Sequence, residues 1–249
     1  MLTNPYLRPR GDDPPALALG CMNFGTRSPE AEAVRIIDRS LDAGIGLLDT
    51  ANMYYDGESE RVVGRALRGR RGDVLVATKV GLLTVDGQNE GLSRATVLAS
   101  CEASLRRLQM DFVDLYYLHA PDPQTPVEET LGAVGTLLEA GKIRHWGVSN
   151  YASWQILELR HLAASAGLPA PVVAQQMYNP LILQLDVEYF SFAARFPIHT
   201  TVYNPLAGGL LTGLHRLDSV PASGSRFDGN PKYQRRFWSP ALFAAVDAL

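Results

Sequence analysis

Four side chains in the first half of the sequence have types and positions suited to proton transfer. Asp49 ends the apolar run GLLD, and Tyr54 follows it in the turn TANMYYDGESE. Lys79 ends DVLVATKV, and His119 ends FVDLYYLH. Considered alone, each residue has an ordinary structural role, such as a turn cap, a half-buried aromatic or a buried histidine. They could form one site if the runs that they end are neighbouring strands.

The chemistry of such a site follows from its charges. An ammonium beside a phenol favours the phenolate, and a carboxylate beside the ammonium keeps it charged and oriented. Tyr54 could therefore donate a proton near neutral pH, while His119 could hydrogen-bond a substrate carbonyl oxygen. The four residues include no nucleophile, metal cluster or pair of free carboxylates. They suit proton delivery to a carbonyl oxygen, with the hydride supplied by a cofactor.

Seven short apolar or β-branched runs are predicted to be strands, and they lie far enough apart to alternate with helices. Segments of helical periodicity separate them, for example Val34, Ile37 and Leu41. No long linker or shift in composition interrupts this alternation, so residues 1–249 are predicted to form a single domain. The predicted strands are 15–20, 44–49, 73–80, 112–119, 143–150, 171–176 and 198–205.

Several helix ends carry typical signals. Ser28-Pro29 is predicted to open one helix, and residues 125–128 (TPVE) are predicted to form a capping box with proline at the first helical position. Gly44 and Gly141 follow the last periodic residues of two helices. Near the end of the chain, a loop is predicted to lead into a helix that starts close to Ser239-Pro240.

Alternating strands and helices with nearly all-apolar strands require a mainly parallel α/β sheet, either doubly wound or a (β/α)8 TIM barrel. The segment LGCMNFG does not have the G-x-G-x-x-G spacing of a doubly wound dinucleotide binder. Polar residues also end many successive strands, at the rim where barrel enzymes build their sites. We therefore expect a barrel, in which strands about 4.8 Å apart bring Asp49, Lys79 and His119 together.

The composition narrows the class of protein. The 23 Lys and Arg residues nearly balance the 26 Asp and Glu residues, so no nucleic acid or anionic membrane partner is expected. Cys21 and Cys101 have no metal-ligand spacing, and no metal is predicted. The N-terminal residues show no signal sequence, and the apolar runs are shorter than a membrane span, so a cytoplasmic protein is expected.

Six motifs in order resemble those of the aldo-keto reductase superfamily. They are LLDTANMYYDGESE, ATKVG, DLYYLHAPDP, GVSN, QQMYNPL and YNPLAGGLLTG. The sequence is most similar to the branch that includes the aflatoxin aldehyde and succinic semialdehyde reductases. This resemblance implies a catalytic tetrad of Asp49, Tyr54, Lys79 and His119, with Tyr54 as general acid. It also implies reduction of an aldehyde or ketone to an alcohol with NADPH, and NADH is not excluded.

The resemblance further implies a cofactor site. Ser149, Asn150 and Gln175 would bind the nicotinamide carboxamide, and Tyr203 would stack on the nicotinamide ring. Segment 204–213 resembles a pyrophosphate-binding loop, in which glycines let backbone N–H groups approach the phosphates. The loop residues assigned to the cofactor are Asn204, Pro205, Leu206, Gly208, Gly209, Leu211 and Gly213.

Residues of other segments are implied to complete this site. Asp49, Cys21 and Met22 would lie near the cofactor, and Arg226 would reach its adenosine side. Phe24, Tyr55 and His119 would line the pocket for a small-molecule aldehyde or ketone.

The sequence also departs from the family pattern. The residues after Tyr203 are too few for the remaining barrel elements, so the barrel is predicted to lack its eighth strand and final helix. Unpaired edge strands and apolar surface would then favour aggregation or a homodimer. Two alternatives to a reductase stay open: a nicotinamide cofactor-binding regulatory subunit with little turnover, like the ion-channel β subunits of the family, and an inactive truncated product.

Overall fold

The computed structural model of the protein describes residues 17–249, which divide into two compact units. The first unit contains the residues up to Ala174 together with Pro197–His199. The second contains Gln175–Phe196 and Thr200–Leu249. Part of the strand predicted at 15–20 lies outside the described residues. A single domain for residues 1–249 stays a prediction.

The first unit is built on parallel strands that pair in the order of the chain. Each strand hydrogen-bonds to the next, and the register places Asp49 opposite Ala77 and Lys79 opposite Tyr117. A doubly wound sheet would reverse its strand order at a switch point, so this order matches the predicted barrel instead. The strands are β1 (Leu19–Gly20), β2 (Leu47–Asp49), β3 (Leu75–Val80), β6 (Val113–Leu118) and β7 (Ile143–Ser149).

Two more strands begin in the first unit and continue the order. The N–H of Val172 donates to Trp146 O at 3.0 Å beside β8 (Val173–Met177). The N–H of His199, the first residue of β9 (His199–Tyr203), donates to Val172 O at 3.2 Å. In the part of the chain that the structure describes, no strand follows β9.

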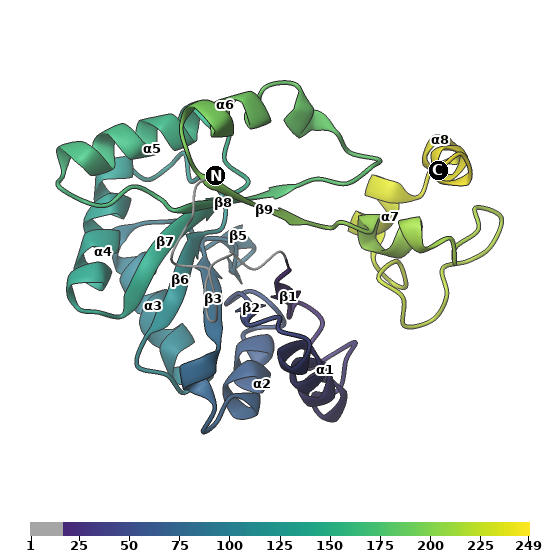
Figure 1. Ribbon diagram of the computed structural model, residues 1–249, viewed down its shortest axis with the longest axis horizontal. Coiled ribbons are helices and arrows are strands. Elements are labelled where there is room, and N and C mark those ends of the chain that lie inside the picture. The colour runs from purple at the N-terminus through teal and green to yellow at the C-terminus, as the bar shows by residue number, and fades with distance from the viewer. Residues whose placement is uncertain (1–16) are drawn as a thin grey trace. The chain divides into compact units, whose positions relative to one another are not determined.

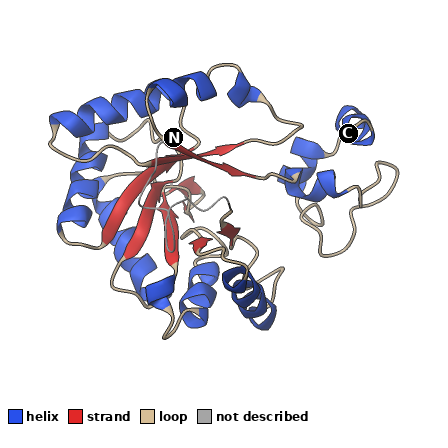
Figure 2. Ribbon diagram, in the orientation of Figure 1, coloured by secondary structure: helices blue, strands red, loops and turns tan. Residues whose placement is uncertain are grey.

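Five helices of the first unit connect its strands and lie on one side of them (Figures 1 and 2). Each contacts the next helix along the chain. The other side of the strands buries an apolar cluster that includes Leu47, Leu115 and Tyr117. The helices are α1 (Glu30–Asp42), α2 (Glu58–Ala66), α3 (Arg94–Leu108), α4 (Val127–Glu139) and α5 (Ser153–Ser165).

The helix-end predictions succeed only in part. Gly44 and Gly141 follow α1 and α4 with φ of 82° and 67°, as predicted. The predicted capping box at 125–128 is wrong, since Pro126 is itself the N-cap and has no side-chain cap. The hydroxyl of Thr125 instead donates to Asp122 Oδ2 at 2.7 Å. Thr125 lies one residue before the N-cap, so its hydroxyl belongs to the preceding loop.

Between β3 and α3 the chain forms elements that were not predicted. β4 (Thr84–Val85) and β5 (Gln88–Asn89) make an antiparallel hairpin. Asp86 and Gly87 connect them with φ of 50° and 80°. An Asp-Gly pair in this conformation is the standard signal for a two-residue hairpin turn, so the sequence did contain the information. A short 3₁₀ turn, η2 (Arg71–Asp73), precedes β3.

The second unit has its own small core. Its elements are η3 (Gln184–Asp186), α6 (Tyr189–Arg195), η4 (Ala207–Thr212), α7 (Pro231–Phe237) and α8 (Pro240–Asp247). Phe227, Phe237 and Phe243 pack together with Leu210. The start of α8 confirms the helix predicted at Ser239-Pro240. Helix α7 was not predicted, although Asn230 caps it by accepting the N–H of Tyr233 at 3.3 Å.

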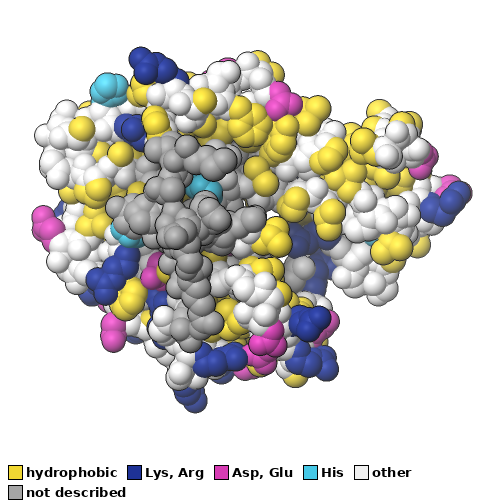
Figure 3. Space-filling view, in the orientation of Figure 1, with side chains coloured by type: hydrophobic (Ala, Val, Ile, Leu, Met, Phe, Trp, Pro, Cys, Tyr) yellow, Lys and Arg dark blue, Asp and Glu magenta, His cyan; other side chains and the backbone are white. Residues whose placement is uncertain are grey.

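Charged side chains of both signs are interspersed on the face of the molecule shown in Figure 3. Among residues 17–249, no helix combines the length and apolar character that crossing a membrane requires.

Substitution of Gly64 in α2 should destabilise the fold, because α2 and α3 approach closely there. A Cβ at this position would lie 2.4 Å from the carbonyl oxygen of Leu108, which is backbone and cannot rotate away. Gly64→Ala should cost about 1–3 kcal/mol of unfolding free energy, measured by urea denaturation.

Gly132→Ala in α4 is the matched control. Its Cβ would meet only the end of the flexible Arg94 side chain, at 3.1 Å. It should be neutral or stabilising by up to about 1 kcal/mol, because alanine favours helix. Equal losses in the two variants would contradict the proposed role of the close helix contact.

Candidate active site

A buried ion pair lies at the carboxyl ends of β2 and β3. The Lys79 Nζ donates to Asp49 Oδ1 and, at 2.7 Å, to the carbonyl oxygen of Thr50. Lys79 is 0% exposed and Asp49 is 8% exposed. Burial by itself opposes the charge on Lys79, but the Asp49 carboxylate and Tyr54 outweigh it, so the pKa of Lys79 is raised above its ordinary value. Lys79 is therefore held as an ammonium.

Tyr54 and His119 complete the predicted group of four. The Tyr54 hydroxyl lies 3.5 Å from Lys79 Nζ, and the ammonium also lies 5.1 Å from the centre of the Tyr54 ring. The ring of His119 meets that of Tyr54 edge-on, with centroids 6.1 Å apart. The structure thus brings Tyr54, which the sequence placed in a turn, together with the three side chains that it placed at strand ends.

The backbone between β2 and α2 carries Tyr54 to this position. The N–H of Asn52 donates to Lys79 O at 3.3 Å, which keeps the chain beside β3. Tyr55, Asp56 and Gly57 then take φ of 50°, 52° and 79° and turn the chain into α2. Left-handed conformations cost roughly 1–2 kcal/mol for each non-glycine residue, so other contacts must hold this turn.

The first turn of α2 supplies these contacts. The Ser59 hydroxyl donates to Cys21 O at 2.8 Å and lies 2.7 Å from the Thr50 hydroxyl. The fully buried carboxylate of Glu60 accepts from Thr78 Oγ1 and pairs with Arg107 Nε, both at 2.5 Å. Helix α2 is thereby fixed to the residues that follow β1 and β2, to β3 and to α3, immediately after the Tyr54 turn.

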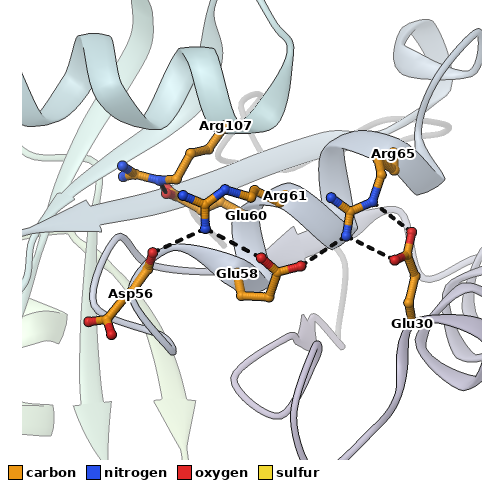
Figure 4. A network of polar contacts seen from close by, with 7 residues as sticks. All are labelled: Glu30, Asp56, Glu58, Glu60, Arg61, Arg65 and Arg107. Atoms are coloured by element: carbon orange, nitrogen blue, oxygen red, sulfur yellow. Dashed lines mark hydrogen bonds and ion pairs between the residues drawn. The ribbon is translucent and has the colours of Figure 1, made fainter.

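A chain of more exposed charges continues along α2. Arg61 pairs with Glu58, and Arg65 pairs with both Glu58 and Glu30 of α1 (Figure 4). Such exposed ion pairs contribute little stability, with a median of about 0–1 kcal/mol. The buried Glu60–Arg107 pair is the one on which the position of α2 depends.

Two of the predicted cofactor residues lie beside the tetrad at the end of β7. Ser149 is buried, whereas Asn150 is exposed with φ of 63°. The Asn150 side-chain amide donates to His119 O at 2.9 Å and to Ser149 Oγ at 3.0 Å. The chain therefore presents a hydroxyl and an amide next to His119, groups that can hydrogen-bond a carboxamide.

The remaining predictions in the first unit concern the segments after β1 and β2. The thiol of Cys21 is fully buried and donates to Leu19 O at 3.4 Å, and burial raises its pKa well above the ordinary value. Phe24 is buried, Met22 is half-buried and Tyr55 is 39% exposed.

The second unit holds the other predicted cofactor residues. Gln175 is buried in β8, and Tyr203 ends β9 half-buried. In the following loop, Asn204 has φ of 63°, and Ala207, Gly208 and Gly209 have φ of 50°, 72° and 108°. Consecutive residues of left-handed backbone turn N–H groups in directions that a helix does not, as a loop that binds an anion requires.

A polar chain ties Arg226 to this loop within the second unit. Arg226 Nη1 donates to the Tyr233 hydroxyl at 3.0 Å, and the guanidinium lies 5.2 Å from the centre of the Tyr233 ring. Asn204 Nδ2 lies 3.4 Å from the same hydroxyl. The loop residues that take no part in these polar contacts are Pro205, Leu206, Leu211 and Gly213. Sequence reasoning missed Tyr233, which no motif marks.

The described residues contain no group of three or more His, Cys, Asp or Glu side chains that could hold a metal ion. The Aldo/keto reductase family model matches residues 16–245 of the chain. The chain belongs to the aldo/keto reductase family.

The most similar proteins include both reductases and a dehydrogenase of this family. Aflatoxin B1 aldehyde reductase member 2 from Mus musculus is 40% identical over 240 residues, covering 93% of the chain and 64% of the mouse protein. The structure of glycerol dehydrogenase AKR11B4 from Gluconobacter oxydans matches with a TM-score of 0.76 and 31% identity, covering 93% of the chain and 72% of that protein. The holo form of aldo-keto reductase AKR11C1 from Bacillus halodurans matches with a TM-score of 0.71 and 33% identity. The match covers 92% of the chain and 76% of that protein.

These similarities confirm the predicted family, its aflatoxin aldehyde reductase branch and the barrel-type fold. The chain spans about two thirds of the length of the curated relatives that it matches, for example 64% of the mouse protein.

Removing the buried ammonium should destabilise the protein strongly. Lys79→Met leaves Asp49 buried without its partner, so we expect a loss of about 3–5 kcal/mol in urea unfolding. The double variant Asp49→Asn/Lys79→Met removes both charges and should recover part of that loss. The single variants Lys79→Met and Asp49→Asn provide the comparison. If the double variant loses as much stability as the two single variants together, the ion pair is not the cause of the destabilisation.

The pH dependence of this pair has a definite sign. The folded chain raises the pKa of Lys79 above its ordinary 10.5, so the stabilisation is fully present below that value. It should be lost as the pH rises through the higher folded-state pKa. The stability gap between the wild type and Lys79→Met should therefore narrow above pH 10.5.

Proposed function

We propose that the protein is an NADPH-dependent oxidoreductase that reduces the carbonyl of a small aldehyde or ketone to an alcohol. The observation that carries this proposal is the contact of the Tyr54 hydroxyl with the buried, charged Lys79 at 3.5 Å. Membership of the aldo/keto reductase family and the similarity to an aldehyde reductase support it.

In the proposed reaction Tyr54 is the general acid. Its hydroxyl proton passes to the carbonyl oxygen while a hydride reaches the carbonyl carbon, which yields the alcohol and leaves a phenolate. The Lys79 ammonium stabilises that phenolate, and Asp49 and the Thr50 carbonyl keep the ammonium in place. The phenolate then regains a proton from solvent.

His119 orients the substrate in this scheme. Its ring lies at the edge of Tyr54, where it can hydrogen-bond the same carbonyl oxygen. The backbone carbonyl of His119 holds Asn150, so the substrate-orienting residue and the carboxamide-binding residues are mutually positioned. Phe24 and Tyr55 are proposed to line the substrate pocket.

The nicotinamide cofactor, when bound, supplies the hydride. Ser149 and Asn150 in the first unit and Gln175 in the second have the donors and acceptors that a carboxamide needs. Tyr203 is proposed to stack on the nicotinamide ring, with Cys21 and Met22 nearby. Residues of 204–213 are proposed to bind the pyrophosphate, and Arg226, a fixed cation of the same unit, the adenosine phosphate of NADPH.

Replacement of the proposed acid tests this function. Tyr54→Phe keeps the ring and removes only the hydroxyl, so kcat for reduction of 4-nitrobenzaldehyde or succinic semialdehyde should fall by about 10²–10⁴-fold. The loss of NADPH absorbance measures turnover, and fluorescence titration should give an unchanged Kd for NADPH.

Tyr178→Phe is the matched control, since it removes the hydroxyl that donates to Asp186 at 2.8 Å in the second unit. This variant should keep the wild-type kcat. Turnover unaffected by Tyr54→Phe would refute the proposed acid. NADPH binding by the wild type without turnover of any carbonyl would instead favour a cofactor-binding regulatory subunit.

A further inference from the structure

Glu90 lies just after the β4–β5 hairpin. Its carboxylate accepts hydrogen bonds from three parts of the first unit. Its Oε1 accepts from Asn52 Nδ2 at 2.7 Å and from the N–H of Gly81 at 2.8 Å. The N–H of Leu83 approaches the same oxygen at 3.3 Å, and Oε2 accepts from the Ser100 hydroxyl at 2.7 Å. One side chain thus connects the Tyr54 turn, the end of β3 and helix α3.

Two of these donors lie very close in sequence to Tyr54, the proposed acid, and to Lys79, which supplies the ammonium beside it. Asn52 is two residues before Tyr54, and Gly81 is two residues after Lys79. Glu90 therefore bridges the two segments that carry these groups. The contact that this bridge would control is a long one, with 3.5 Å between the Tyr54 hydroxyl oxygen and Lys79 Nζ. A small displacement of either segment would break it.

Asn52 depends on Glu90 for its side-chain hydrogen bonding. It is only 1% exposed, so water does not replace a lost partner. Within residues 17–249, its Oδ1 has no hydrogen-bond partner, and its Nδ2 donates to Glu90. A buried amide of this kind is costly to leave without its remaining bond. Loss of the Glu90 carboxylate should therefore displace Asn52 and the turn that follows it.

We propose that Glu90 is a positioning residue that, through Asn52, sets the distance between the Tyr54 hydroxyl and the Lys79 ammonium. This inference rests on the proposed function for its kinetic consequence. The geometric part, that Glu90 controls the position of Tyr54, stands independently of any turnover.

The kinetic test compares two ways of breaking the same bridge. Glu90→Ala and Asn52→Ala should each lower kcat by about 10–100-fold, because a misplaced acid loses its alignment. The Kd for NADPH should stay within about twofold of the wild type, since neither residue belongs to the proposed cofactor site. The double variant should be no slower than Glu90→Ala alone, because both changes break one connection.

Two control variants separate positioning from general stability. Glu90→Gln keeps an oxygen for Asn52 and Gly81 and can donate to Ser100, so it should restore most of the wild-type kcat. Ser100→Ala removes only the contact between Glu90 and α3, so this variant should also keep most of the wild-type kcat. If Glu90→Ala does not fold, Asn52→Ala still carries the test, because it leaves the backbone contacts of Glu90 in place.

A second readout needs no turnover. In protein labelled with [ζ-¹³C]tyrosine, the Tyr54 resonance is identified by its disappearance in Tyr54→Phe. It should shift in Glu90→Ala and Asn52→Ala and keep its wild-type position in Glu90→Gln and Ser100→Ala. A wild type without carbonyl turnover would refute the proposed function, while this resonance would still decide the role of Glu90.

Two results would overturn the proposal. One is a Tyr54 resonance that stays in place in folded Asn52→Ala and Glu90→Ala. The other is a loss of kcat in Glu90→Ala that Asn52→Ala does not reproduce, which would mean that Glu90 acts on the hairpin alone.

Discussion

The buried ammonium of Lys79 constrains everything around it. A charge withdrawn from water needs partners at fixed distances, and here Asp49, the Thr50 carbonyl and Tyr54 provide them. These groups come from the end of β2 and the turn after it. Parallel pairing of β2 with β3 is what makes the meeting possible, because it places the ends of both strands at one rim.

The turn that carries Tyr54 is costly in itself and is stabilised from several sides. Its left-handed residues Tyr55 and Asp56 lead directly into the first turn of α2. There Ser59 and the buried pair of Glu60 with Arg107 attach the helix to its neighbours. The position of one phenol hydroxyl thus depends on contacts with Cys21 after β1, with β3 and with α3. Such support is typical of a site built on rigid elements.

Much of the site could be predicted from the sequence because strand ends determine where its residues lie. The apolar runs before Asp49, Lys79 and His119 are easily detected, and parallel pairing in chain order does the rest. Contacts between distant polar residues could not be predicted in this way. Nothing in the periodicity marks the buried Glu60 or the half-buried Glu90 as acceptors, or Tyr233 as the partner of Arg226. The capping box failed because α4 begins at Val127 with Pro126 as its N-cap, one residue later than the motif predicted.

The proposed catalytic residues and the proposed phosphate-binding residues belong to different compact units. All of the proposed tetrad and carboxamide residues of the first compact unit lie near the ends of β2, β3, β6 and β7 or in the residues that follow them: Asp49, Tyr54, Lys79, His119, Ser149 and Asn150. The residues proposed for the pyrophosphate and adenosine belong to the second unit. In the proposed function, proton transfer is the task of the first unit, and recognition of the pyrophosphate and adenosine is the task of the second.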